Sequence, residues 1–429
     1  MDPASIEKIR QEKKALKEEK RRLKKQQNPS GPPSPPPPSP FKRTWRSTSA
    51  RSISGRATIT IMSYNILAQT LCQRWIHPTA GDMLKWKTRR RMIMEEIALY
   101  QPDLMCLQEV DNYEEFYKES LKKLGYETIF HKHETKRHGC LIGYQSKTWK
   151  PMTYRTIDYD TDTSSKPTQI TGNIGQLLAL AFRNENDDSN GMTYSSTLGV
   201  VVGNTHFYWR PPSSYERCRQ GLIYRHHLMA LQKELKSSHS GEWVPLMLGD
   251  FNTQPCDPFY SIVTGRALTD EHRFVLKATQ RAFDDDDHDY EPQPSSKDDI
   301  DATISAASET TLEEDGLMDM DDLMRMIGPK EDEAMQSVYS LHKQLWDQQQ
   351  EQEGIKTNCE EHNRYGVGEP DYTNAAHVFK GTLDYLFIPP HITIMDVLLL
   401  PPKDKIQPAL PNEHFGSDHV SLVAKILLP

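Results

Sequence analysis

A series of short apolar runs, each bordered by an acidic, amide or imidazole residue, constrains the fold of this chain most strongly. The runs with strand character are Thr58–Tyr64, Leu104–Leu107, Gly199–Asn204, Val244–Leu248, Leu383–Ile388 and Val420–Leu427. Two longer segments, Lys85–Tyr100 and Tyr215–Leu235, carry apolar residues at helical spacing. Strands that alternate with helices predict an α/β domain in which helices cover sheets.

The polar residues that border these runs fall in six short segments. They are Ser63–Gln69 (SYNILAQ), Cys106–Val110 (CLQEV), Asn204–Phe207 (NTHF), Gly249–Asn252 (GDFN), Leu383–Phe387 (LDYLF) and Ser417–His419 (SDH). Each segment alone has an ordinary structural explanation, such as a turn or a helix cap. Together they place carboxylate, amide and imidazole groups at the rims of sheets, where side chains can face a cleft. Carboxylate and amide oxygens are the ligands that Mg²⁺ prefers.

Two charged segments divide the chain. Residues 1–56 hold fifteen Lys/Arg against five Asp/Glu and include a proline-rich stretch at Ser30–Pro40, which predicts a basic, Pro-rich, disordered N-terminal arm. We expect the folded domain to span residues 57–429. An acidic, largely disordered insertion at residues 271–364 is expected to interrupt it, because residues 284–322 hold sixteen Asp/Glu against one Lys. Met335–Gln350 is expected to form a short helix there.

Composition excludes several classes of protein. The six cysteines form no CxxC pair, which argues against a zinc site or a dense disulfide framework. No stretch approaches the roughly 18 apolar residues of a membrane span, and the N-terminus lacks a secretory signal. We therefore expect an intracellular protein with no membrane partner, in the nucleus, the cytoplasm or both. The basic arm permits contact with nucleic acid, but such arms also serve as solubilising or targeting tails.

The ordered set of segments resembles the deadenylase-like branch of the exonuclease–endonuclease–phosphatase superfamily, which includes nocturnin, the Angel proteins and fungal Ngl-type RNA exonucleases. The resemblance covers about Ile59–Arg266 and Tyr365–Leu428. It rests on YNILAQ, LKWKTRR, CLQEV, KRHGC, NTHFYWRP, GDFNTQP, YTN, FKGTLDYLF and SDHVSL, and the WIHP and GDMLKW segments favour the Ngl-type enzymes. His138 stands in KRHGC where the branch commonly has an aspartate.

The resemblance implies a two-sheet β-sandwich flanked by helices, with the site at one end of the sheets. It implies metal binding by Glu109, Asn65 and Asp418, with Mg²⁺ as the cofactor and Mn²⁺ as a possible substitute. The implied catalytic residues are Asp250, Asn252, His419, Asp384 and His206: the GDFN pair positions water and phosphate, Asp384 orients His419, and His206 faces the phosphate. Whether one or two metal ions act stays open.

The same resemblance implies three substrate-binding residues. Phe379 would stack on a base and Pro211 would flank the nucleotide, whereas Phe379 packed in the core is the alternative. Arg219, like its neighbour Arg217, either holds backbone phosphates or forms an exposed helix face.

These observations predict a magnesium-dependent 3′-to-5′ RNA exonuclease that binds single-stranded RNA 3′ ends and releases nucleoside 5′-monophosphates. The favoured role is trimming of structural RNA such as ribosomal RNA precursors. A poly(A) deadenylase, a phosphatase acting on a small nucleotide and a non-catalytic RNA-binding adaptor stay open as alternatives. The roughly 56 residues before the core contain no leucine-rich repeat, so docking on a deadenylase complex through such repeats is not expected. The partners of the acidic insertion stay unknown.

Overall fold

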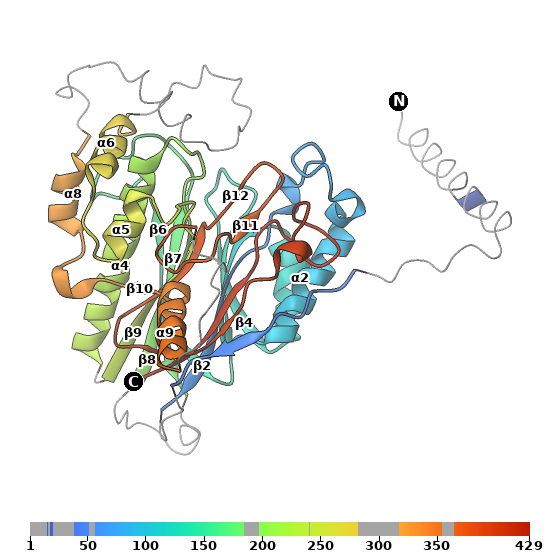
Figure 1. Ribbon diagram of the computed structural model, residues 1–429, viewed down its shortest axis with the longest axis horizontal. Coiled ribbons are helices and arrows are strands. Elements are labelled where there is room, and N and C mark those ends of the chain that lie inside the picture. Colours follow the sequence, from blue (N-terminus) through green and yellow to red (C-terminus); the bar gives the residue numbers. More distant parts are fainter. Residues whose placement is uncertain are drawn as a thin grey trace. The chain divides into compact units, whose positions relative to one another are not determined.

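The computed structural model describes residues 15, 18, 19, 38–50, 56–183, 197–239, 241–281, 317–353 and 364–429 (Figure 1). Ser39–Pro429 forms one compact unit, and Met1–Pro38 is a separate unit. Most of the basic arm and most of the acidic run therefore lie outside the described residues. In the described part of the chain, no helix has the length and apolar character needed to cross a membrane.

Two mixed sheets form the centre of the larger unit. The first has the strand order β1-β14-β15-β2-β3-β5-β4 and the second β10-β13-β9-β8-β7-β6. The strands of the first sheet are β1 (Trp45–Ser47), β2 (Thr58–Asn65), β3 (Leu104–Val110), β4 (Tyr126–His131), β5 (Gly139–Gln145), β14 (Thr393–Leu398) and β15 (Leu422–Leu427). Those of the second are β6 (Trp149–Asp158), β7 (Ile174–Phe182), β8 (Thr197–His206), β9 (Gly241–Asp250), β10 (Gln336–Ser337) and β13 (Asp384–Ile388). A short ribbon, β11 (Asn374–Ala375) and β12 (Lys380–Gly381), precedes β13.

Helices cover the outer face of each sheet. On the first sheet these are α2 (Trp86–Tyr100) and α3 (Lys118–Lys122), the latter preceded by the π-helical turn η3 (Tyr113–Tyr117). On the second sheet they are α4 (Ser214–Ser238), α5 (Pro258–Val263), α6 (Asp270–Ala278) and α8 (Met320–Ile327). A further helix, α9 (Val338–Gln352), follows β10, and short 3₁₀ turns lie at Gln69–Leu71, Gly81–Leu84, Glu331–Glu333 and Lys403–Lys405. The predicted two-sheet sandwich flanked by helices is confirmed.

Central strands such as β3 have apolar interiors because both of their faces are buried. In β3, Leu104 and Cys106 pack in the core between the two sheets, while Met105 and Leu107 pack in the core under α2. Successive strand side chains point to opposite faces, so a strand between two cores needs apolar residues at every position. In such strands the polar residues that carry the candidate chemistry lie at the ends, and this placement positions the site.

The folded unit begins earlier than the predicted boundary near residue 57. β1 pairs antiparallel with β14 at the edge of the first sheet. Arg43 is buried, donating to Ser421 O (2.8 Å) and pairing with Glu96 (3.3 Å), and the Lys425 ammonium lies 4.6 Å from the Trp45 ring centroid. This segment is anchored by the buried cation of Arg43 and by the rings of Phe41 and Trp45 rather than by an apolar run, so hydrophobic patterning gives no sign of it.

Part of the predicted disordered insertion is also folded. Within residues 271–364 the structure contains most of α6, all of α8 and all of α9, and Leu323 and Val338 are fully buried. α8 packs on α4, so its few apolar residues complete an existing core rather than building a new one. The expected short helix is α9, and residues 282–316 and 354–363 lie outside the described residues.

Candidate active site

Strand register brings three predicted site residues side by side in the second sheet. Asp250 at the end of β9 lies opposite Asp384 on β13 and opposite His206 on β8. In the first sheet, Asn65 at the end of β2 lies opposite Gln108 on β3, one residue before Glu109. The ends of these strands meet at one end of the sandwich, where side chains from both sheets contact each other.

Asp250 is the hub of the site. Its carboxylate is buried and accepts hydrogen bonds from Asn65 Nδ2 (2.8 Å) and from the Asn252 backbone N–H (3.0 Å). Its Oδ2 also lies 3.6 Å from His206 Nε2 and 3.7 Å from His419 Nε2. One carboxylate thus faces two imidazoles, an arrangement suited to accepting a proton and passing it on.

Glu109 is held as an ionised carboxylate. Its oxygens accept hydrogen bonds from Asn65 Nδ2 (3.1 Å) and the Ala68 backbone N–H (2.9 Å), and its backbone has a left-handed φ of 57°. Burial raises the pKa of Glu109, but the positive charges of His206 and His138 together with the two hydrogen bonds lower it to about 2. A non-glycine residue at positive φ is uncommon, and such positions often lie at functional sites.

His419 is paired with Asp384. His419 Nδ1 lies 2.8 Å from Asp384 Oδ2, and Thr373 Oγ1 donates to the same oxygen (2.6 Å). Burial lowers the pKa of His419, but the charges of Asp384 and Asp250 outweigh it and raise that pKa well above the usual value. The ligand atoms of Asp250, Asp384 and His419 all lie within 4.8 Å of one another. Since His419 Nδ1 is already hydrogen-bonded to Asp384, we interpret this trio as a proton relay rather than as a metal cage.

The chemistry of the donors fits a divalent cation beside Glu109. Glu109 offers an ionised carboxylate, as a hard cation requires. Asn65 turns its amide nitrogen toward the Glu109 and Asp250 carboxylates, and its Oδ1 accepts from the Leu67 N–H (3.0 Å), so its role as an oxygen ligand stays a prediction. Asp418 is half-buried, and its neighbour Ser417 donates to Asn65 O (2.7 Å), which places it on the Asn65–Glu109 side of the site. Its role as a third metal carboxylate stays a prediction.

Hydrogen bonds to neighbouring residues fix the catalytic side chains, and several of these neighbours had no predicted role. Gln108 Nε2 donates to Asn204 Oδ1 (2.8 Å), and Asn204 Nδ2 donates to Leu107 O (3.1 Å), so buried amides tie the two sheets together directly behind the site. Ser417 Oγ donates to Asn65 O (2.7 Å). Gln108, Asn204 and Ser417 lie in the CLQEV, NTHF and SDH segments. For Gln108 and Asn204, the signal that would have found them is a polar side chain inside an otherwise apolar strand.

The predicted nucleotide-flanking residues lie on exposed loops. Pro211 is exposed, and Phe379 is half-buried against Gly381, where an added Cβ would come within 2.7 Å of the Phe379 ring. Trp209, in the same β8–α4 loop as Pro211, is 56% exposed. Asn252 Nδ2 donates to Phe207 O (2.8 Å), so its amide also supports this loop. Contact of Phe379 and Pro211 with a nucleotide stays a prediction.

Arg219 is a correction. Its guanidinium is fully buried and pairs with Glu216 (2.7 Å), while donating to Tyr159 O (2.7 Å) and Ser165 O (3.0 Å). Arg217 is likewise buried and donates to the backbone carbonyl of Pro211 (2.8 Å). Helical periodicity places Arg219 on α4 without revealing which face is covered, and here the β6–β7 loop covers it. Arg219 stabilises the fold and does not reach a substrate phosphate.

We expect Arg219→Met to destabilise the protein by about 3–5 kcal/mol, because it leaves Glu216 as an unpaired buried charge. Denaturant unfolding of the purified variant measures this change. The matched control is Arg273→Met, which removes an exposed pair with Asp321 and should change stability by less than about 1 kcal/mol. Wild-type stability together with a raised KM for RNA would restore Arg219 as a substrate residue.

Similarity to known proteins extends over most of the chain. Residues 62–419 match the Endonuclease/Exonuclease/phosphatase family. The chain is 30% identical over 351 residues to RNA exonuclease NGL2 of Saccharomyces cerevisiae, covering 76% of this chain and 65% of that protein. It is 31% identical over 397 residues to the probable RNA exonuclease C9B6.11c of Schizosaccharomyces pombe, covering 86% of this chain and 76% of that protein. The chain thus spans slightly less than two thirds of NGL2.

Two solved structures share the fold. ANGEL2, described as a 2′,3′-cyclic phosphatase in complex with adenosine-2′,3′-vanadate, superimposes with a TM-score of 0.64 at 20% identity over 90% of this chain and 99% of that one. The human nocturnin catalytic domain gives a TM-score of 0.52 at 20% identity over 90% of this chain and 98% of that one. At this identity the likeness supports the fold alone. The length of the family match and the identity to the fission yeast relative show that the chain belongs to the Endonuclease/Exonuclease/phosphatase family.

Proposed function

We propose that the protein is a magnesium-dependent 3′-to-5′ RNA exonuclease that releases nucleoside 5′-monophosphates. The observation that carries the proposal is the position of Asp250 between two imidazoles, one of them paired with Asp384, directly beside the Asn65–Glu109 pair. Cleavage of a phosphodiester bond needs an activated water, and Asp250 offers a base for it. The phosphate oxygens gain negative charge during the reaction, and protonated His419 together with a bound cation would stabilise that charge.

Each residue then has a definite task. Asp250 accepts a proton from the attacking water, and Asn252 supports the β8–α4 loop, whose Pro211 would flank the nucleotide. Protonated His419, held by Asp384, donates to the phosphate oxygens as charge develops on them, and His206 faces the same group. Glu109, oriented by the Asn65 amide, would hold Mg²⁺, which when bound supplies Lewis-acid stabilisation of the phosphate charge.

RNA is the proposed substrate because the two yeast relatives are named RNA exonucleases. The exposed Trp209 and Pro211 and the half-buried Phe379 offer apolar surfaces on which unpaired bases can stack. Stacking makes little demand on sequence, which suits an enzyme that moves along single-stranded 3′ ends. Trimming of structural RNA, including ribosomal RNA precursors, is the role we favour over poly(A) shortening.

The test is a time course with Mg²⁺ and two 5′-labelled single-stranded RNAs, one ending in adenosines and one in mixed sequence. We expect a ladder that shortens from the 3′ end of both RNAs, with nucleoside 5′-monophosphates as products. Glu109→Gln removes the ionised metal ligand at nearly constant volume and should abolish the ladder. The identity of the product tests the release of nucleoside 5′-monophosphates, and the preference between the two RNAs separates general 3′ trimming from poly(A) shortening.

Three other outcomes would change it. Shortening of the adenosine-ended RNA alone would make the protein a deadenylase. Release of inorganic phosphate from small nucleotides or from cyclic-phosphate ends, without shortening, would make it a phosphatase. RNA binding with no turnover of any substrate would leave an adaptor that keeps the fold.

A further inference from the structure

A small pocket lies beside the candidate active site, and basic side chains line much of it. His133, Lys136 and His138 come from residues 132–138, the loop that joins β4 to β5, and His206 and Asn173 complete the polar lining. The ring centroids of His138 and His206 are 6.4 Å apart, so the pocket opens next to the group that faces Asp250. Its volume of about 20 Å³ admits oxygen atoms of a compact group and excludes a nucleobase.

The pocket is held in shape by the loop that faces it. Gly172 has a φ of +64°, and a Cβ there would come within 2.9 Å of both Lys136 Cε and Thr135 Oγ1, so only glycine lets the two loops approach this closely. The Asp160 carboxylate accepts hydrogen bonds from the backbone N–H groups of Thr171 (3.0 Å) and Gly172 (2.7 Å). Next along the chain, Asn173 Nδ2 donates to His206 O (2.8 Å), which joins the pocket wall to the catalytic strand.

Lys136 is the strongest sign that the pocket takes an anion. It is half-buried, and in the described part of the chain its ammonium makes no hydrogen bond or ion pair. Burial acts to lower the pKa of Lys136, and Asp160 is the acidic neighbour that opposes this effect. A cation drawn partly out of water without a direct partner is stabilised by an anion that enters beside it.

We propose that the pocket formed by His133, Lys136 and His138 is an anion subsite that binds a second phosphate group of the RNA, next to the phosphate that is cleaved. The inference rests on the proposed RNA substrate, and it assigns the KRHGC loop a binding role. A strand whose neighbouring phosphate is held here is fixed in position, so its terminal bond enters the catalytic centre in register. The contact is to the backbone, so it adds affinity without sequence preference.

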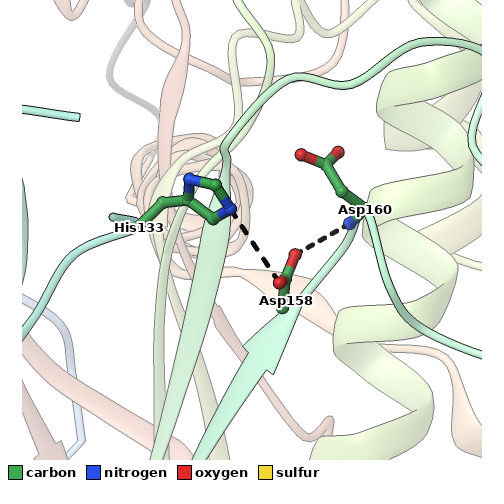
Figure 2. A group of neighbouring side chains, drawn as sticks. All are labelled: His133, Asp158 and Asp160. Carbon is green, nitrogen blue, oxygen red and sulfur yellow. Dashed lines mark hydrogen bonds and ion pairs between the residues drawn. The ribbon is translucent and has the colours of Figure 1, made fainter. Parts of the chain in front are cut away.

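A cation site is the competing interpretation, because His133, Asp158 and Asp160 also lie close together. Figure 2 shows the His133 ring and the Asp158 carboxylate pointing toward one another, 3.9 Å apart, with Asp158 Oδ1 accepting from the Asp160 N–H (3.0 Å). The Asp160 oxygens are already occupied by Thr171 and Gly172, and Lys136 lies within electrostatic range of them. The acidic pair therefore serves to orient His133 and the facing loop.

The first test measures RNA binding without divalent ions, so it does not depend on catalysis. The full chain is titrated with a fluorescent adenosine hexanucleotide in EDTA over a series of salt concentrations. Lys136→Met should weaken binding about fivefold and reduce the slope of log Kd against log salt by about 0.7, the value for one lost contact to a single-strand phosphate. Lys123→Met, which removes the same charge from the exposed end of α3, should change neither, and Lys136→Arg should retain both.

Unchanged binding by Lys136→Met, or an equal loss with Lys123→Met, would overturn the subsite. The subsite would also be overturned if Mn²⁺ strengthened RNA binding equally in the wild type and in Lys136→Met but had no such effect in Asp160→Asn. That result would indicate a cation at the acidic pair.

The second test locates the phosphate by turnover with Mg²⁺. The dinucleotide ApA has no second phosphate, pApA carries one on its 5′ side, and ApAp carries one at its 3′ end. Wild-type kcat/KM should be about fivefold higher for pApA than for ApA, and Lys136→Met should hydrolyse both alike. A preference for ApAp that Lys136→Met loses would support the subsite with a terminal phosphate as its ligand. No preference for either phosphate would contradict it, whereas binding that depends on Lys136 without any hydrolysis would refute only the exonuclease activity.

Discussion

Replacement of Asp250 by asparagine is expected to lower kcat/KM for RNA about 10³-fold while the protein stays folded. The substitution keeps the shape of the side chain but removes the charge that both His206 Nε2 (3.6 Å) and His419 Nε2 (3.7 Å) face. It therefore removes the proposed base and weakens the field that keeps His419 protonated. Single-turnover hydrolysis of a labelled RNA at saturating protein measures the chemical step without product release.

The same variant makes a second prediction about stability. Asp250 Oδ1 accepts from the Asn252 N–H and Oδ2 from Asn65 Nδ2, and an asparagine has only one oxygen to satisfy these two donors. One buried donor loses its partner, which costs about 1–3 kcal/mol in the free energy of unfolding. The matched control is Asp103→Asn. Asp103 directly precedes β3, at the end of that strand away from the site, so this variant should keep activity near the wild-type value. If the Asp250→Asn variant retained wild-type turnover, Asp250 would have no part in the mechanism.

The sequence predicted the strands and the site because the same pattern encodes both. The first four residues of β3 are apolar since each face packs in a core, and the polar residues that follow lie toward the rim. The rule placed their segments at the rims of the sheets, and the family resemblance carried by the order of those segments implied Asn65, Glu109, Asp250 and His419 as site residues. The structure adds the register that the sequence could not provide, in which Asp250 stands opposite both Asp384 and His206.

The failed predictions share a different physical cause. Arg219 and Arg43 are charged residues whose burial depends on partners far away in sequence, Tyr159 O for the first and Ser421 O for the second. Local patterning reads an arginine as exposed, because an unpaired buried charge is costly, and cannot see a partner supplied by another loop. α8 was missed for the same reason, since its apolar residues complete a core built by α4. The left-handed backbone of Glu109 also has no sequence signal.

The Asp384→Asn substitution is expected to reduce turnover by about 10²–10⁴-fold and to shift the pH dependence of the remaining activity. In the wild type, the carboxylates of Asp384 and Asp250 raise the pKa of His419, so the ring stays protonated through neutral pH and activity should fall only as the pH rises through that raised value. Without the Asp384 charge the pKa of His419 falls, and the alkaline limb of the kcat/KM profile should move to lower pH by about 1–3 units.

The direction of this shift separates orientation from charge. Thr373→Val removes the hydroxyl that donates to Asp384 Oδ2 (2.6 Å) and accepts from the Leu383 N–H (2.9 Å), so it loosens the carboxylate but keeps its charge. We expect this variant to lower kcat with an alkaline limb close to that of the wild type. If Asp384→Asn lowered activity without moving the limb, Asp384 would act only by orienting the ring. If the alkaline limb moved to higher pH, the group that titrates there would not be His419. The assignment of a protonated His419 facing the phosphate would then be wrong.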